Sequence, residues 1–391
     1  IVVMAESFDM WLYPKCQNGY ARLFKDWADR DITNLVLANR NHPSLIMYSI
    51  GNEIPEQWSD EGREIARHLQ DLCHRLDPTR MVTQGMDRPD DALKSGFAQV
   101  MDIPGFNYRV WKYPKDISHL TCGYLLGSET ASTISSRGVY KFPVTWGANI
   151  TYPDGQCNGY DTQWCPWSNL PEEDFMAQND ASYTIGQFVW TGFDYLGEPT
   201  PYDSYWPARS SYFGICDLAG LPKDRYYLYR SVWNTKENTV HVLPHWTWPG
   251  REGQITPVFV YTSYPSAELF INGKSMGKRT KLSITDGEYN TGRPATPSDA
   301  ERRAARYRLM WKDIKYEPGE LKVICYDDSG YQAAEISEHT AGKACAIKLQ
   351  ADRDTIQADG SDLAYITVFL TDKDGYPIPT AEDELQFTVS G

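Results

Sequence analysis

The segment that decides the fold reads Leu45-Ile46-Met47-Tyr48-Ser49-Ile50-Gly51-Asn52-Glu53. Its first six residues are mostly apolar, which is typical of a strand buried on both faces of a parallel sheet. Similar segments alternate with helical patterns from Ile1 to about Asn234, so the sequence predicts βαβ units. The strand-like segments are residues 1–5, 45–51, 80–84, 100–106, 123–127 and 185–192, and the helical ones are residues 19–39, 60–76 and 171–183.

The pattern changes after about Thr235 to short strands joined by turns. The polar segment 291–308 between them is expected to be a solvated loop. Strands are expected at residues 257–262, 267–271, 275–279 and 321–326 and again within 346–391, with a hairpin turn at Asn272-Gly273. We therefore expect an α/β domain at residues 1–234, a β-sandwich at 235–342 and a second, truncated β-sandwich at 343–391.

Two glutamates follow buried strands in the same way. Glu53 ends the segment quoted above, and Glu129 follows the strand at 123–127 through Ser128. In a βα barrel the carboxyl ends of the strands carry the catalytic groups. A glutamate after a strand can also cap the next helix, but two in equivalent positions favour function over capping. Such a pair suits hydrolysis of a glycosidic bond, in which one carboxyl donates a proton and the other stabilises positive charge on the sugar.

Composition narrows the class of partner. The 38 Lys and Arg against 52 Asp and Glu give a net charge of −14, which disfavours nucleic acid. No apolar run approaches the roughly 20 residues of a membrane span. The eight cysteines show no zinc-site spacing. The 13 Trp, 26 Tyr and 13 Phe exceed ordinary usage, which fits a surface that binds sugar faces, although most rings are expected to serve the core.

Several longer motifs resemble glycoside hydrolase family 2, the family of β-galactosidases, β-glucuronidases and β-mannosidases. The most specific is the run from Arg40 to Glu53, which resembles the acid/base signature of that family. Further similar motifs follow in the right order at residues 105–108, 128–130 and 188–199. Beyond them, residues 241–281 are similar to the β-sandwich that follows the barrel in many bacterial members, and residues 346–391 to a bacterial Ig-like repeat.

The resemblance implies a retaining double displacement on a carbohydrate substrate. It assigns Glu53 as the general acid/base and Glu129 as the nucleophile. Asn52 matches the residue that hydrogen-bonds the sugar 2-hydroxyl, and Tyr108 matches the tyrosine that hydrogen-bonds the nucleophile. Trp190 matches the indole that forms the floor of the sugar subsite.

Other residues carry weaker expectations. Asp9 is expected near the same pocket, where ligand contact and a structural hydrogen bond are equally open. His42 is expected to be a positioned loop histidine that could contact a sugar hydroxyl, because the two glutamates fill both catalytic roles. Glu198, in a Gly-Glu-Pro turn, is expected to be structural. Some of the loop tryptophans Trp11, Trp146, Trp164, Trp167 and Trp206 are expected to wall the cleft.

Departures from the family pattern narrow the interpretation. Glucuronidases of the family carry an Asn-x-Lys motif for the substrate carboxylate, whereas residues 209–214 here read Arg-Ser-Ser-Tyr-Phe-Gly, so a neutral sugar is favoured. The magnesium site of some β-galactosidases needs an acidic residue and a nearby histidine, and the corresponding residues 9–11 here read Asp-Met-Trp, so we expect no metal and no cofactor. β-Galactosidase is the preferred activity. The alternatives are β-glucuronidase, β-mannosidase, and a non-catalytic carbohydrate-binding or adhesion protein.

The number of predicted strands indicates whether the barrel is complete. A (β/α)8 TIM barrel has eight strands and six are recognised here; in the family, the strands that end in Glu53 and Glu129 are the fourth and seventh. We therefore expect a bacterial TIM barrel that lacks its first two βα units. An amino-terminal portion absent from this chain, or another copy in a homo-oligomer, is expected to complete it. The family and the Ig-like tail suggest a periplasmic or secreted enzyme.

Overall fold

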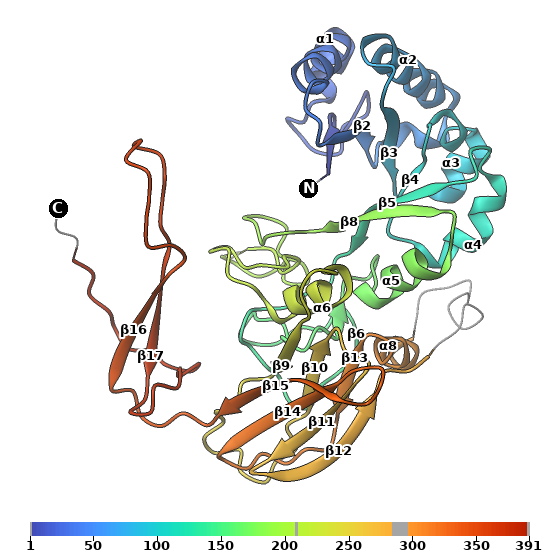
Figure 1. Cartoon of the computed structure of the whole chain (residues 1–391). Coiled ribbons are helices and arrows are strands. Elements are labelled where there is room, and N and C mark those ends of the chain that lie inside the picture. Colours follow the sequence, from blue (N-terminus) through green and yellow to red (C-terminus); the bar gives the residue numbers. More distant parts are fainter. Residues whose placement is uncertain (1, 208–209, 284–295, 389–391) are drawn as a thin grey trace.

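The structure is a computed structural model that describes residues 2–207, 210–283 and 296–388. Three parts follow one another along the chain: an open parallel sheet covered by helices, an antiparallel β-sandwich, and a separate two-stranded hairpin (Figure 1). In the described part of the chain, no helix is long and apolar enough to cross a membrane. The predicted combination of an incomplete TIM barrel with β-sandwich domains is confirmed.

The first part contains one sheet of six parallel strands in the order β1-β2-β3-β4-β5-β8. β1 and β8 form its two edges, so the sheet is an open half-barrel. All neighbouring strands point the same way, and their carboxyl ends therefore meet at one edge of the sheet. The strands are β1 (Val3–Glu6), β2 (Leu45–Asn52), β3 (Met81–Met86), β4 (Gly105–Asn107), β5 (Leu125–Ala131) and β8 (Thr184–Trp190).

One predicted strand is largely wrong. Of residues 100–106 only Gly105 and Phe106 belong to β4, and residues 98–100 form a 3-10 helix. Pro104 contributes to the late start, because it has no backbone N–H to donate to a neighbouring strand. Asp102 adds to the irregularity, since its carboxylate accepts the Val82 N–H at 2.8 Å.

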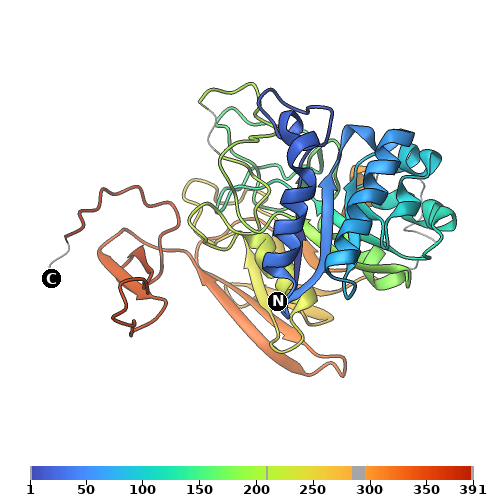
Figure 2. The same cartoon turned by 90° about the horizontal axis from the view of Figure 1, so that it is seen from above.

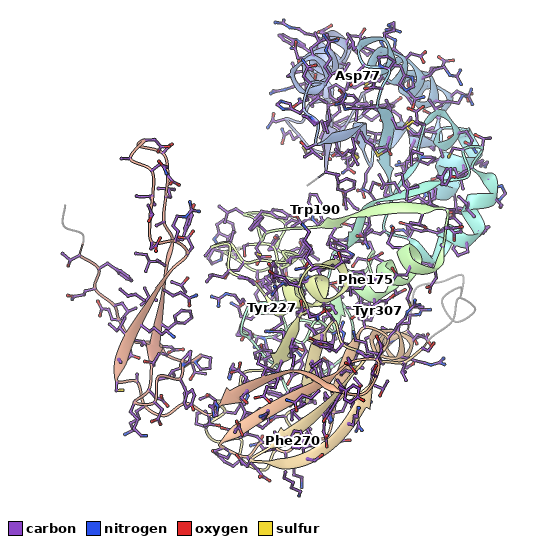
Figure 3. All side chains as sticks on the ribbon, in the orientation of Figure 1. Asp77, Phe175, Trp190, Tyr227, Phe270 and Tyr307 are labelled. Atoms are coloured by element: carbon purple, nitrogen blue, oxygen red, sulfur yellow. The ribbon has the colours of Figure 1, made fainter. Side chains whose placement is uncertain are left out.

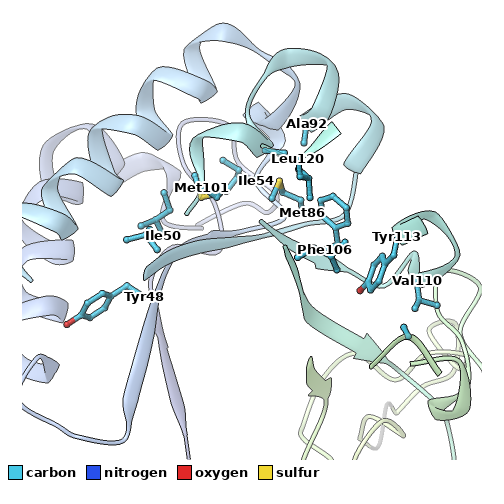
Figure 4. Packing of buried hydrophobic residues seen from close by; sticks show 14 of the residues in the cluster. Tyr48, Ile50, Ile54, Met86, Ala92, Met101, Phe106, Val110, Tyr113 and Leu120 are labelled. Carbon is cyan, nitrogen blue, oxygen red and sulfur yellow. The ribbon is translucent and has the colours of Figure 1, made fainter. Parts of the chain in front are cut away.

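Helices cover the outer face of the sheet (Figure 2). α1 buries Phe24, Ala28, Ile32 and Val36, which recur every four residues and so form one apolar stripe. Figure 4 shows part of the resulting core, with residues such as Met86 between the sheet and the helical segments. The helices are α1 (Ala21–Asn39), α2 (Asp60–Leu76), α3 (Pro89–Ser95), α4 (Tyr113–Asp116), α5 (Pro171–Asp180) and α6 (Asp224–Trp233); short 3-10 helices lie at Pro55–Trp58, Ala98–Val100, Val110–Lys112 and Ile117–His119, and a small bridge joins β6 (Gly147–Ala148) to β7 (Gln163–Trp164).

The second part is a sandwich of two antiparallel sheets, in the orders β13-β10-β9 and β12-β11-β14-β15. Val260, Leu269 and Val323, from both sheets, share one core. β10 and β11 are consecutive in sequence but lie in different sheets. The hairpin turn between β11 and β12 falls at Asn272 and Gly273 as predicted. The strands are β9 (Val240–Leu243), β10 (Val258–Thr262), β11 (Ser266–Ile271), β12 (Lys274–Thr280), β13 (Arg308–Trp311), β14 (Glu320–Tyr326) and β15 (Gln332–His339).

The segment expected to be a solvated loop is in large part a docked helix. Residues 291–295 lie outside the described residues, but α8 (Pro297–Ala304) starts at a capping box formed by Thr296 and Asp299. Arg303 and Arg308 of this segment are buried, contrary to the prediction. Their charges find partners on α5, which is more than 120 residues away in sequence.

α5 joins the half-barrel to the sandwich through buried ion pairs. The Arg308 Nε donates to Glu172 Oε1 at 2.6 Å, and Arg303 Nη1 donates to Glu173 Oε2 at 2.9 Å. Phe175 packs beside Tyr307 with 5.2 Å between ring centroids (Figure 3). All four charged side chains are buried, so the sandwich holds α5 at its amino-terminal end.

The third part is the hairpin of β16 (Ala346–Ala351) and β17 (Ile366–Thr371), which lies apart from the half-barrel in both views (Figures 1 and 2). It touches the sandwich at its base. His339 stacks on Tyr376 at 4.3 Å between ring centroids, and the Gly342 N–H donates to Asp372 Oδ2 at 2.8 Å.

Candidate active site

A cavity of about 360 Å³ lies at the carboxyl-terminal edge of the parallel sheet. Every strand of the sheet contributes to its lining from its carboxyl end or the loop that follows, as expected where parallel strands end at a common edge. Carboxylates outnumber cations five to two in this lining. The lining residues are Asp9, Lys15, Asn52, Glu53, Asp87, Tyr108, Arg109, Glu129, Trp167, Trp190 and Glu198.

Glu53 stands directly after β2. Its backbone N–H donates to the Gly85 carbonyl at 2.8 Å, and its Oε1 accepts the Asn107 amide at 3.0 Å. Burial raises the pKa of the Glu53 carboxyl, and the Asn107 hydrogen bond partly opposes this rise. The Asn107 amide therefore holds the Glu53 carboxyl in place whether or not the other carboxyl oxygen, Oε2, carries a proton.

Glu129 lies within β5 and receives a hydrogen bond from a tyrosine. The Tyr108 hydroxyl lies 2.9 Å from Glu129 Oε2 and 2.8 Å from Ser132 Oγ. Burial, and next the negative charge of Glu53, raise the pKa of Glu129 to about 8, while the Tyr108 hydrogen bond lowers it. Because each carboxylate disfavours ionisation of the other, the pair keeps one proton over a wide pH range around neutrality. A singly protonated carboxyl pair can supply both an acid and a nucleophile.

An amide pair orients the residues next to the carboxyls. Asn107 Nδ2 also donates to Asn52 Oδ1 at 2.8 Å, and Asn107 Oδ1 accepts Ser128 Oγ at 2.7 Å. Gly85 leaves the room for this contact, since a Cβ at that position would lie 2.7 Å from Asn107 Oδ1 and 2.8 Å from Asn52 Oδ1. The position of the Asn52 amide thus depends on three neighbouring strands: β2 carries it, β3 leaves room for it at Gly85, and β4 supplies the Asn107 hydrogen bond.

Trp190 lies at the carboxyl end of β8, where Figure 3 labels it. Its Nε1 donates to the Tyr195 hydroxyl at 3.0 Å, and that hydroxyl in turn donates to Glu198. Glu198 lines the cavity and adds to the negative field around Glu129. Glu198, which was expected to be structural, thus accepts a hydrogen bond from Tyr195 and also lines the cavity.

Asp9 lies in the cavity wall, as expected, and is paired with a lysine. Lys15 Nζ donates to Asp9 Oδ1 and to the Asn52 carbonyl, each at 2.9 Å. The Asn52 amide lies 3.4 Å from the same Asp9 oxygen. Asp9 thereby has both a structural hydrogen bond and an open face toward the cavity.

His42 is not brought to the site. It precedes β2, whereas Glu53 follows it, and an eight-residue strand separates their ends by roughly 26 Å. Among the loop tryptophans only Trp167 lines this cavity. Trp11 and Trp164 are buried, Trp206 is 91% exposed, and Trp146 lies in a different hollow.

Sequence reasoning missed Lys15, Asp87, Asn107 and Arg109. Asp87 could have been found, because it follows β3 as Glu53 follows β2. Lys15 and Arg109 lie in loops whose path no local pattern reveals. Among the residues that the structure describes, no group of three or more His, Cys, Asp or Glu could hold a metal ion.

Four lining residues adopt a left-handed backbone conformation: Glu53 (φ 43°), Tyr108 (φ 57°), Arg109 (φ 56°) and Glu198 (φ 43°). Each such conformation costs a non-glycine residue roughly 1–3 kcal/mol, and it persists only where the surroundings enforce it. The concentration of strained residues around one cavity marks it as the functional site.

The comparisons agree with this geometry. The model of the family described as "Glycosyl hydrolases family 2, TIM barrel domain" matches residues 17–120. The model described as "Glycoside hydrolase family 2 C-terminal domain 5" matches residues 347–391. The β-galactosidase BoGH2A of Bacteroides ovatus is 37% identical over all of this chain and 47% of its own length. The chain belongs to glycoside hydrolase family 2.

Other relatives differ in their named activity. A β-glucuronidase of Bacteroides fragilis is 23% identical over 76% of this chain and 39% of its own length. A β-glycosidase structure from Bacteroides vulgatus superposes with a TM-score of 0.75 and 29% identity, over 96% of this chain and 47% of that one. A domain of unknown function, DUF4982, matches residues 253–334. The chain spans about half the length or less of these relatives.

Proposed function

We propose that this family 2 chain carries the catalytic centre of a retaining exo-β-glycosidase that removes terminal β-linked galactose. Glu53 is the general acid/base and Glu129 the nucleophile. The observation that carries the proposal is the convergence of these two carboxyls in one cavity, each with its own hydrogen-bond donor and a raised pKa. Asn52, Tyr108, Trp190 and Asp9 are proposed to bind or orient the sugar.

The reaction proceeds in two displacements. In the first, a Glu129 carboxylate oxygen bonds to the anomeric carbon, the bond to the leaving-group oxygen breaks, and Glu53 gives its proton to that oxygen. In the second, the Glu53 carboxylate takes a proton from water, whose oxygen attacks the anomeric carbon and releases Glu129. The Tyr108 hydroxyl favours the ionised form of Glu129 that the first step needs.

Two observations favour a galactoside. The β-galactosidase BoGH2A matches the whole of this chain at 37% identity. The cavity also holds five carboxylates against Lys15 and Arg109, and this negative field disfavours a uronic acid. The alternative activities are β-glucuronidase, which several named relatives carry, and β-mannosidase.

The test is hydrolysis of nitrophenyl β-galactoside, β-glucuronide and β-mannoside by the complete gene product. The galactoside is expected to be cleaved fastest, and Glu129→Gln is expected to lose at least about 10⁴-fold in kcat. Glu61→Gln, on an exposed face of α2, is the matched control and should keep full activity. Turnover that survives in Glu129→Gln contradicts the assignment, and glycan binding without turnover by the wild type supports a carbohydrate-binding protein instead.

Azide separates the roles of the two carboxyls. In Glu53→Ala, azide is expected to attack the glycosyl-enzyme from the face that water uses and give a β-glycosyl azide. In Glu129→Ala it is expected to take the place of the nucleophile and give an α-glycosyl azide. Each product follows from the face of the sugar ring on which the removed carboxyl would lie, because azide enters through the space that this carboxyl leaves. The opposite pairing of variant and product would exchange the two roles.

A further inference from the structure

Lys223 is a buried lysine whose ammonium group contacts three segments of the chain. It directly precedes α6 and is 1% exposed. Its Nζ donates to Asp194 Oδ1 at 2.8 Å, to the Ser135 carbonyl at 2.8 Å and to the Tyr212 carbonyl at 3.2 Å. An ammonium group has three N–H donors, and these bonds use all of them. Lys223 therefore has no donor left for a substrate, and its influence on a reaction passes through its partners.

Asp194 links this ammonium to the segment that follows β8. It lies four residues after Trp190 and directly before Tyr195. Its carboxylate also accepts the Gly214 N–H at 2.8 Å, and its own N–H donates to the Cys216 carbonyl at 3.0 Å. The two segments approach so closely that a Cβ on Gly214 would lie 2.2 Å from the Asp194 nitrogen. The position of the segment after β8 is thus set by contacts outside the cavity.

Two residues that line the cavity depend on this segment. The Tyr195 hydroxyl accepts the Trp190 Nε1–H at 3.0 Å and donates to Glu198. Trp190 and Glu198 both line the cavity, one before Asp194 in the sequence and one after it. Because Tyr195 directly follows Asp194, a displacement of Asp194 moves the hydroxyl that both lining residues contact.

Ser135 links the same ammonium to the strand of the proposed nucleophile. The Ser135 N–H donates to the Tyr212 carbonyl at 3.1 Å, which is also a partner of the ammonium. Three residues earlier in the sequence, Ser132 Oγ lies 2.8 Å from the Tyr108 hydroxyl, and that hydroxyl donates to Glu129 at 2.9 Å. One buried cation therefore connects the segment after β5 with the segment after β8.

The charge of Lys223 is matched by a buried carboxylate. The side chains of Lys223 and Asp194 are 1% and 9% exposed, and their charged atoms approach to 2.7 Å. Burial, and next the charge of Arg225, lower the pKa of Lys223 to about 8, while Asp194 and Asp161 oppose this fall. Removal of one partner leaves an uncompensated buried charge, whereas removal of both charges costs much less stability. This difference allows the positioning effect of the pair to be separated from its effect on stability.

We propose that Lys223 is a positioning residue of the proposed active site. Through Asp194 it fixes the cavity wall formed by the segment after β8, and through the Ser135 carbonyl it fixes that wall relative to the strand of the nucleophile. The inference rests on the proposed function and extends it to a residue outside the cavity. A wall displaced by about 1 Å is enough to lower a rate by roughly 100-fold, because catalytic groups and substrate must be held in reacting geometry.

The test compares variants of matched stability in the complete gene product. Lys223→Met leaves Asp194 buried without its cation and is expected to lower the stability. The double variant Lys223→Met with Asp194→Asn removes both charges, keeps an oxygen for the Gly214 N–H and is expected to recover most of that stability. The double variant is nevertheless expected to keep kcat/KM for the best nitrophenyl glycoside at least roughly 10-fold below the wild type. Competitive inhibition by the released monosaccharide should weaken with it, because the displaced wall belongs to the sugar site.

Two single variants complete the comparison. Lys223→Arg keeps a cation beside Asp194 and should recover part of the activity lost in Lys223→Met. Lys281→Met is the matched control, because Lys281 follows β12 in the sandwich and burial lowers its pKa to about 8 as well. Its Nζ donates to the Thr262 carbonyl at 2.5 Å. Lys281→Met is therefore expected to lower stability without changing kcat/KM.

Different outcomes overturn the positioning role and the proposed function. Wild-type kcat/KM in the double variant, or an equal loss of kcat/KM in Lys281→Met, would show that Lys223 acts on stability alone. Asp194→Asn tests the same link if the Met variants do not fold, and wild-type kcat/KM in that variant would also overturn the proposal. These results leave Glu53 and Glu129 in their roles. Hydrolysis that persists in Glu129→Gln would instead overturn the proposed function, and the positioning role with it.

Discussion

Replacing Glu129 by glutamine is expected to stabilise the protein progressively as the pH rises, although it removes the proposed nucleophile. Burial and the charge of Glu53 raise the pKa of Glu129 from 4.5 to about 8. Between these two values the folded protein holds a proton that the unfolded chain has released. The unfolded state binds fewer protons there, so the free energy of unfolding falls as the pH increases. Glutamine has the shape of the protonated acid and does not titrate.

The magnitude follows from the size of the pKa shift. Each pH unit over which only the unfolded chain is ionised costs about 1.4 kcal/mol. From about pH 5 to about pH 8, Glu129 therefore lowers the stability of the wild type by roughly 4 kcal/mol relative to Glu129→Gln. Titrating groups that do not interact with Glu129 are common to both proteins and cancel in the difference. Below about pH 4.5 the two proteins should be equally stable.

The assay is urea unfolding of both proteins across this pH range. Unfolding is monitored by the fluorescence of the tryptophans, many of which lie in the half-barrel. The difference between their free energies of unfolding should grow with pH. Glu61→Gln, at an exposed position of α2, is the matched control and should track the wild type. Parallel curves for Glu129→Gln and wild type would refute the claim that the buried pair of Glu53 and Glu129 keeps one proton near neutral pH.

Three further changes test other parts of the structure. Arg308→Met leaves Glu172 buried without its cation and should lower the free energy of unfolding by about 3–5 kcal/mol in a denaturant titration. The double variant with Met at both positions should recover most of that stability. Equal stability of the single and double variants would count against the ion pair. Tyr108→Phe removes the donor to Glu129, so the acidic limb of the kcat/KM profile should move to higher pH and kcat should fall by roughly 10-fold; an unmoved limb would show that the hydroxyl does not tune the carboxylate. Gly85→Ala should displace the two asparagine amides and lower kcat/KM by at least roughly 10-fold; wild-type kinetics would show that the site tolerates the added methyl group.

The catalytic pair could be predicted from sequence because its signal is local. Glu53 and Glu129 each follow an apolar run, and parallel strands must end at one edge of their sheet. Asp87 carries the same signal after β3 and was overlooked. His42 was misplaced for the converse reason: it is near Glu53 along the chain but at the opposite end of the same strand.

The buried charges show where local reasoning fails. Residues 297–308 look like solvated chain because they are rich in arginine, and charged side chains are buried only when they are paired. Their partners Glu172 and Glu173 are about 130 residues away, and nothing in either segment indicates the other. A polar sequence was therefore predicted to be exposed when tertiary contacts bury it.

The sequence by itself determined the βαβ pattern, the change to β-sandwich architecture near Thr235 and the two glutamates, because strand periodicity and strand ends are written in neighbouring residues. Only the tertiary structure decided which side chains surround those glutamates. Lys15, Arg109 and Trp167 reach the cavity along loops, and their positions depend on hydrogen bonds to residues distant in the chain. The chemistry of the pair is therefore local information, whereas the field and the walls around it are the product of packing.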